Sequence, residues 1–230
     1  MLAELVVWYL VFVFSTTFHE FSHALVGRIG GDRTAQHAGL VTMDPTVHIL
    51  RSPFGMLVMP VLSFVLYQWM IGWASVPYDP VWGRRHPWRS ALMSAAGPIA
   101  NFVLAALGIV VLRVLLSRGV LVTPEIGTMT ISRLADAPGG LATPLGSLSM
   151  ALSVLVTLNV LLGCFNLLPI PPLDGSGIAE GIGPKAIGRL FDYVREQPML
   201  MMSGTILAWV VINPVVGWAF IVALRLIYPR

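Results

Sequence analysis

Residues 3–26 read AELVVWYLVFVFSTTFHEFSHALV, and this stretch places three ionisable side chains inside one of the most apolar runs of the chain. It is long enough to cross the roughly 20-residue hydrocarbon core of a bilayer as a helix. An ionisable group at the centre of such a helix costs roughly 2.5–3.5 kcal/mol on insertion scales, so function is the default explanation for His19, Glu20 and His23. The stretch therefore predicts a membrane helix that carries a buried site.

The rest of the chain also has the composition of a membrane protein. Of its 230 residues, 56% are hydrophobic and 11% are charged, whereas a soluble domain has about 25% charged residues. We therefore predict an all-α polytopic membrane protein, a single domain over residues 1–230 with five to six membrane segments. The segments are expected at about 3–26, 53–73, 91–116, 147–168 and 199–227, with an amphipathic stretch at 175–197.

Charge in the connecting loops predicts how the chain lies in the membrane. Cytoplasmic loops are usually the richer in Lys and Arg. Loops 27–52, 74–90 and 175–197 carry three cations each, and loop 117–146 carries two. If the three richer loops are all cytoplasmic, segment 53–73 must be re-entrant, entering the membrane and returning. A simple crossing, with one basic loop outside, is the competing interpretation.

The connections themselves are short. The longest non-apolar ones reach only about 20–30 residues, below the usual size of a domain. Within one of them, residues 38–50 (AGLVTMDPTVHIL) are expected to form a small extended hairpin.

His19-Glu20-Phe21-Ser22-His23 fits the pattern H-E-x-x-H. Helical residues four apart share a face, so both imidazoles can ligate one Zn²⁺ while Glu20 reaches a water on the metal. Zinc lowers the pKa of such a water to about 7, and Glu20 would accept its proton and deliver it to a leaving amine. The alternative, a chance match, is weak at membrane depth because of the insertion cost.

A third ligand is needed, since hydrolytic zinc sites usually have three protein ligands and one open position. Asp174 is the candidate, because it ends the segment NLLPIPPLDG at residues 166–175, where three closely spaced prolines end a helix. An Asp in an Asp-Gly turn can instead accept backbone hydrogen bonds, which is the structural alternative. The two-histidine half-site favours ligation.

Taken together, these motifs resemble the site-2 protease family of intramembrane zinc metalloproteases. HEFSH resembles the motif of the first span, FNLLPIPPLDG the N-x-x-P-x-x-P-x-D-G motif, and AGPIANF the small-residue block of the span between them. The loops GGDRTA, GLVTMDPTVHI and GWASVPYDP resemble those of the short bacterial group. The resemblance covers most of residues 10–185.

This resemblance implies a role for each matching residue. His19, His23 and Asp174 would ligate one Zn²⁺ per chain, and Glu20 would be the general acid and base. Asn166 would be a second catalytic residue, which positions the substrate backbone or stabilises the oxyanion.

The implied activity is that of an intramembrane zinc endopeptidase, which hydrolyses peptide bonds in or near transmembrane segments (regulated intramembrane proteolysis). Expected partners are a membrane-protein substrate with a transmembrane segment, the lipid bilayer and a separate regulatory protein, since no stretch is large enough for a PDZ or CBS domain. A net charge of only +3, scattered between apolar runs, argues against a nucleic-acid partner.

The expected location is the bacterial inner membrane, as a multi-pass protein with its active site nearer the cytoplasmic face. The oligomeric state stays open. Two alternative functions are a metal-binding membrane transporter and an inactive protease-like protein that binds partners. Neither alternative requires a glutamate beside the first histidine.

Overall fold

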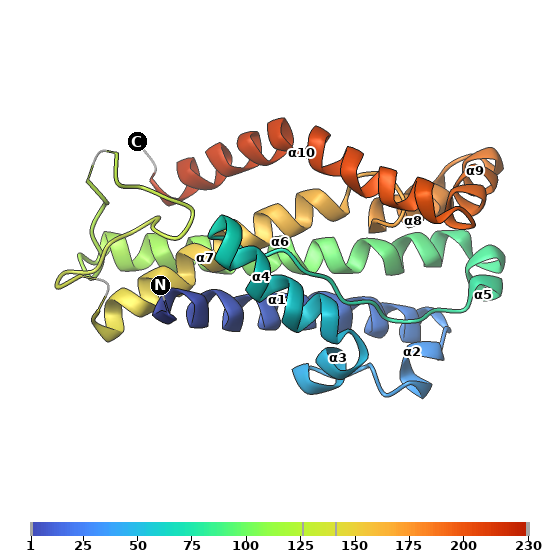
Figure 1. Cartoon of the computed structure of the whole chain (residues 1–230), viewed down its shortest axis with the longest axis horizontal. Coiled ribbons are helices and arrows are strands. Elements are labelled where there is room, and N and C mark those ends of the chain that lie inside the picture. The colour runs from blue at the N-terminus through green and yellow to red at the C-terminus, as the bar shows by residue number, and fades with distance from the viewer. Residues whose placement is uncertain (1, 126, 141, 229–230) are drawn as a thin grey trace.

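Four long helices form a bundle in the computed structural model, which describes residues 2–125, 127–140 and 142–228. They are α1 (Leu2–Gly30), α6 (Pro87–Ser117), α7 (Pro144–Asn166) and α10 (Pro198–Ile227). All four run along the length of the molecule, with α6 in the middle packed against α1 and α7 (Figure 1). Three of them are long and apolar enough to cross a membrane, and up to five spans result if each of two bent helix pairs counts as one.

Shorter helices connect the long ones. They are α2 (Thr34–His37), α3 (Pro45–Arg51), the π-helical turn η1 (Phe54–Val58) with α4 (Met59–Tyr67), α5 (Pro80–Arg85), α8 (Asp174–Ile182) and α9 (Lys185–Arg195). No strand occurs among the described residues, so the all-helical class predicted from the sequence is confirmed.

Several helices of this chain share one local signal at their start. Five helices have Pro at their first position, where the missing N–H has no partner to lose. Asp44, Asp79 and Thr143 precede three of these prolines, and each side chain accepts a hydrogen bond from a backbone N–H of the first turn. The positions of these helix starts are therefore encoded locally.

The same signal corrects the hairpin predicted at residues 38–50. Asp44 caps a helix whose first residue is Pro45, so the second half of that stretch forms α3. His48 consequently lies buried on a helix that packs against α1. Its Nε2 donates to the carbonyl of Thr42 at 3.1 Å.

Two other predicted boundaries also change. The first helix continues through Gly27 to Gly30, because Gly27 is buried against Met93 of α6 and tertiary packing supports the helix there. The amphipathic stretch predicted at 175–197 forms two helices, α8 and α9, with the described residues 183–184 between them.

Segment 53–73 is helical only as far as Tyr67. Beyond Gln68, which caps α4 in a left-handed conformation, the chain runs back without regular structure to α5 at the end of the bundle where α1 finishes (Figure 1). Non-helical backbone is tolerated at membrane depth only where it is buried in protein. Ser63 and Gly55 meet this need: Ile71 N donates to Ser63 Oγ at 2.8 Å, and Trp73 N donates to the carbonyl of Gly55 at 3.0 Å.

Basic side chains gather at this same end of the bundle, which we call the basic end. It is formed by the end of α1, by α5 with the start of α6, and by α9 (Figure 1). Its cations are Arg28, Arg84, Arg85, Arg89, Lys185, Arg189 and Arg195. The positive-inside rule associates such an end with the cytoplasm.

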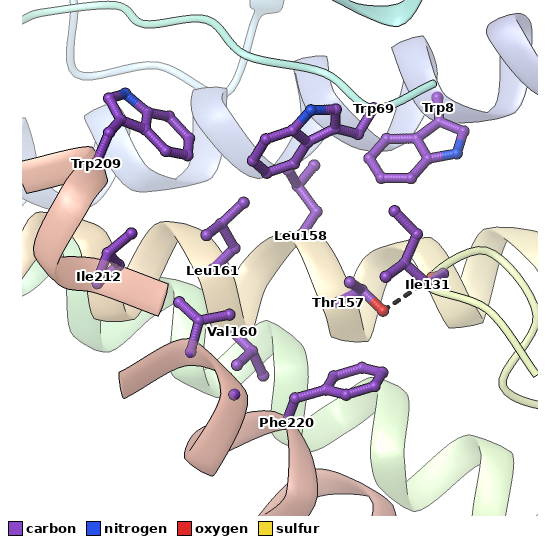
Figure 2. A pocket seen from close by; sticks show the side chains of 12 residues that line it. Trp8, Trp69, Ile131, Thr157, Leu158, Val160, Leu161, Trp209, Ile212 and Phe220 are labelled. Carbon is purple, nitrogen blue, oxygen red and sulfur yellow. Dashed lines mark hydrogen bonds between the residues drawn. The ribbon is translucent and has the colours of Figure 1, made fainter. Parts of the chain in front are cut away.

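Toward the opposite end, the loop between α6 and α7 packs onto the bundle. Its backbone is held by two buried serines of α7: Leu134 N donates to Ser153 Oγ at 2.9 Å, and Ser149 Oγ donates to the carbonyl of Ala135 at 2.6 Å. Beside this loop lies an apolar cavity of about 300 Å³, lined in part by Trp8, Trp69, Trp209 and Phe220 (Figure 2). None of the three residues that form the metal centre described below lines it.

The return of segment 53–73 can be tested by labelling single cysteines. Gln36→Cys and Val81→Cys, which lie before and after the segment, should react with a membrane-impermeant maleimide from the same side of sealed vesicles. Ser117→Cys, at the far end of α6, should react from the other side. The background would be Cys164→Ala, since Cys164 is the single cysteine and is buried.

A segment that crosses once would place the cysteines at positions 36 and 81 on opposite sides. That labelling pattern would contradict the re-entrant arrangement.

Candidate metal centre

Two histidines of α1 face the interior of the bundle. His19 and His23 are buried, and their Nε2 atoms lie 3.0 Å apart. The spacing of four residues places both rings on one face of the helix, as expected from the sequence.

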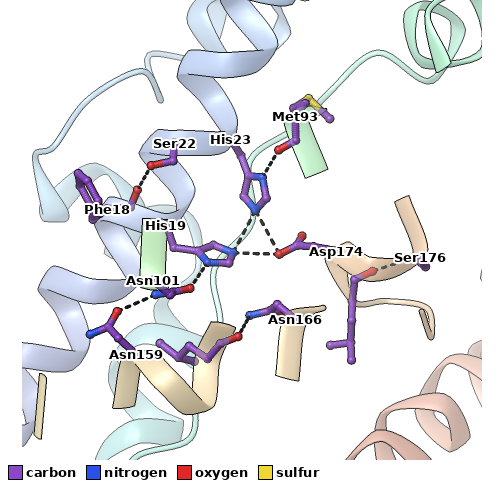
Figure 3. A network of polar contacts seen from close by, with 12 residues as sticks. Phe18, His19, Ser22, His23, Met93, Asn101, Asn159, Asn166, Asp174 and Ser176 are labelled. Atoms are coloured by element: carbon purple, nitrogen blue, oxygen red, sulfur yellow. Dashed lines mark hydrogen bonds and ion pairs between the residues drawn. The ribbon is translucent and has the colours of Figure 1, made fainter. Parts of the chain in front are cut away.

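Asp174 approaches these rings from α8, as Figure 3 shows. Its Oδ2 lies 3.1 Å from His19 Nε2 and 3.3 Å from His23 Nε2. Gly175 makes the approach possible, because a Cβ on this residue would lie 2.3 Å from the carbonyl oxygen of Leu167 at the end of α7. The Asp-Gly pair thus brings the start of α8 tightly against the end of α7.

The three atoms have the spacing of ligands to one small ion. Nitrogen ligands lie about 2.0–2.1 Å from zinc, so the ligands of a tetrahedral site lie about 3.3 Å from one another. The observed separations of 3.0, 3.1 and 3.3 Å are close to this value. Three ligands of this kind would leave one position of a tetrahedral ion open for water or substrate.

The hydrogen bonds behind the rings show which nitrogens face the centre as acceptors. His23 Nδ1 lies 2.7 Å from the carbonyl oxygen of Met93, which can only accept, so the proton of a neutral His23 is on Nδ1. His19 Nδ1 lies 2.6 Å from Asn101 Oδ1. Asp174 Oδ2 is buried and has no hydrogen-bond donor. With both histidines neutral and protonated on Nδ1, three electron-pair donors converge at this point, an arrangement that a cation stabilises.

Gly97 of α6 leaves the space that the two rings occupy. A Cβ on this residue would lie 2.3 Å from His23 Nε2 and 2.5 Å from His19 Nε2. Met93, Gly97 and Asn101 follow at intervals of four, so one face of α6 forms the wall behind the centre. Figure 3 shows Met93 and Asn101 on this wall, each joined to one histidine.

Glu20 is buried next to His19. Its role as the general acid and base stays a prediction.

Asn166, the second residue with a predicted catalytic role, is the last residue of α7. Its side-chain nitrogen donates to the carbonyl of Leu162 in its own helix at 3.1 Å. Figure 3 shows it on the same side of the site as Asp174. Its catalytic role stays a prediction.

Sequence reasoning missed the polar residues behind His19. Asn101, Asn159 and Ser15 are fully buried, and Asn159 is hydrogen-bonded to both of the others. The available signal was the presence of two amides in otherwise apolar helices, since polar residues inside membrane helices are costly.

Comparisons with known proteins identify similarity to peptidases. A family model described as Peptidase family M50 matches residues 7–211. A protein of Bacillus subtilis (strain 168) named "Putative zinc metalloprotease YwhC" is 31% identical over 176 residues, which are 76% of this chain and 68% of that protein. No solved structure matches the chain.

Replacing Gly97 by Ala should displace the two imidazoles and lower bound zinc at least tenfold. The new methyl group has no room beside the two Nε2 atoms, while Ala is the better helix former by about 1 kcal/mol, so the helix itself is not weakened. Zinc content of the purified protein, measured by plasma mass spectrometry, checks this. Gly188→Ala on α9 is the matched control, because a Cβ there meets nothing within 4 Å. Equal zinc content in both variants would contradict the role of Gly97.

Asp174→Asn should also lower bound zinc, because an amide is a much weaker ligand for zinc than a carboxylate. The control is Asp192→Asn, which makes the same chemical change at an exposed position on α9. The same metal analysis decides the outcome. If Asp174→Asn retains the zinc content of the unchanged protein, Asp174 is not a ligand.

Proposed function

The chain belongs to peptidase family M50, the family of site-2 proteases, and from this premise we propose that it is a zinc endopeptidase that cleaves membrane proteins in or near their transmembrane segments. The observation that carries the proposal is the convergence of His19, His23 and Asp174, with their ligand atoms within 4.8 Å of one another. This donor set fits one zinc ion per chain.

Each residue would have a defined task. His19, His23 and Asp174 hold the metal, which when bound polarises the scissile carbonyl and lowers the pKa of a water to about 7. Glu20 takes a proton from the attacking water and gives it to the leaving amine. Asn166 is proposed to hold the substrate backbone or to donate to the developing oxyanion. This last role requires its amide to leave the carbonyl of Leu162.

The buried position of the centre supports a substrate inside the membrane. His19 and His23 lie within a helix long enough to span, on the part of α1 nearer the basic end (Figure 1). We therefore place the active site nearer the cytoplasmic face of a bacterial inner membrane. A helical substrate shields its peptide bonds by internal hydrogen bonds, so the substrate must unwind locally before its scissile carbonyl reaches the metal.

Glu20→Gln separates the chemistry from metal binding. Gln has nearly the same size but cannot accept the proton, so cleavage should fall by about 10²–10⁴-fold while zinc content stays unchanged. Quantitative proteomics of cells that carry the wild-type or the Glu20→Gln protein should show single-span membrane proteins accumulating in the latter. Glu180→Gln is the control, since Glu180 pairs with Arg195 away from the rings.

Cleavage that persists in a zinc-loaded Glu20→Gln protein would refute the mechanism. Zinc flux into proteoliposomes that survives the same substitution would instead favour the transporter alternative.

A further inference from the structure

We propose that Asn101 is a positioning residue that fixes the tautomer of His19, and that its own orientation is set by Asn159 and the backbone carbonyl of Leu155. This inference rests on the proposed function, because it assigns His19 to the metal through Nε2. Asn101 lies in the block AGPIANF, to which no role at the site was assigned from the sequence, and Asn159 lies in none of the quoted motifs. Figure 3 shows the two amides and His19 in one row behind the centre.

The contacts form an unbroken row across three helices. Asn101 Oδ1 on α6 lies 2.6 Å from His19 Nδ1 on α1. Asn101 Nδ2 donates to Asn159 Oδ1 on α7 at 2.8 Å. Asn159 Nδ2 donates at 2.8 Å to both Ser15 Oγ and the carbonyl of Leu155. The side chains of Asn101, Asn159 and Ser15 all have an exposed fraction of 0%.

The direction of every bond follows from the last acceptor. The carbonyl of Leu155 can only accept, so Asn159 must turn its NH₂ group toward it and its oxygen toward Asn101. Asn101 must then give its NH₂ group to Asn159, which leaves its oxygen for His19. An imidazole facing that oxygen must donate, so the proton of neutral His19 is on Nδ1.

This assignment has a direct consequence for the metal centre. With Nδ1 protonated, the free electron pair of His19 is on Nε2, which points at His23 and Asp174. The other tautomer would place an N–H bond where the metal must bind. Ligating histidines are commonly oriented by an acceptor on their second nitrogen. Here that acceptor is the side-chain oxygen of Asn101. Asn101 cannot flip, because Asn159 is itself fixed by the backbone carbonyl of Leu155 on α7.

The competing explanation is that the row only joins α1, α6 and α7. Hydrogen bonds between polar side chains do hold membrane helices together. The two explanations predict opposite orders of zinc affinity for two variants of Asn101. Leu fills the same buried space without an acceptor, whereas Asp keeps an acceptor oxygen for His19 whether its carboxyl group is ionised or protonated.

The test is the zinc affinity of the full-length protein in nanodiscs, measured by competition with a chelator of known affinity. We expect Asn101→Leu to weaken zinc binding by about 10–100-fold, the usual cost of losing such a partner. Asn101→Asp should bind more tightly than Asn101→Leu. The visible absorption spectrum of the Co²⁺-substituted protein should likewise change with Leu and stay closer to the wild-type spectrum with Asp.

Two further variants keep the proposal testable if Asn101→Leu does not fold. Asn159→Leu leaves Asn101 beside His19 but frees its amide to flip, so zinc affinity should fall by an intermediate amount. Ser153→Ala is the matched control: it removes two hydrogen bonds from an equally buried residue of α7 that holds the loop at Leu134. Its zinc affinity should stay at the wild-type value.

Three results would overturn the role of Asn101. They are wild-type zinc affinity in Asn101→Leu, weaker binding by Asn101→Asp than by Asn101→Leu, and equal losses in Asn159→Leu and Ser153→Ala. Each of them leaves the peptidase proposal standing, because that proposal depends on cleavage and on Glu20. A wild-type protein that binds no zinc would refute both.

Discussion

Three potential metal ligands meet inside this bundle, with His19, His23 and Asp174 placing their ligand atoms 3.0–3.3 Å apart. Such a group is unfavourable in an apolar interior unless a cation joins it. The arrangement of the chain follows from this constraint. α1 supplies two donors from one face, and α8 brings the third from a helix start held against the end of α7 by the close approach at Gly175.

The face of α6 behind the two histidines also places each of its residues in a defined contact. On one face of α6, Gly97 leaves the space for the rings of the two histidines. The Met93 carbonyl oxygen faces His23 Nδ1, and Asn101 Oδ1 faces His19 Nδ1. A helix can perform these tasks together because residues four apart lie above one another. The cost of burying the amides of Asn101 and Asn159 is offset by their hydrogen bonds to each other, to His19 and to the carbonyl of Leu155.

Segment 53–73 meets a similar physical requirement with its backbone. Residues after Gln68 leave helical structure, and the N–H groups of Ile71 and Trp73 bond to Ser63 and Gly55 in place of a helix ladder. Near the basic end, Asp79 N donates to the buried carboxylate of Asp32 at 2.9 Å, which ties α5 to the end of α1. The chain thus returns to the end from which the segment began.

The sequence by itself determined the features that depend on neighbouring residues. The apolar runs predicted the long helices, and H-E-x-x-H placed His19 and His23 on one face. The proline-rich turn before Gly175 marked Asp174. The start of α3 at Asp44-Pro45 is also a local signal, and it overrode the expected hairpin. Tertiary structure decided the rest: segment 53–73 stopped being helical at Tyr67, and Asn101 bonded to His19. These outcomes depend on contacts between residues far apart in the chain, such as Asn159 with Ser15 across 144 positions. Local spacing carries no information about such partners, because they are neighbours only after the helices have packed.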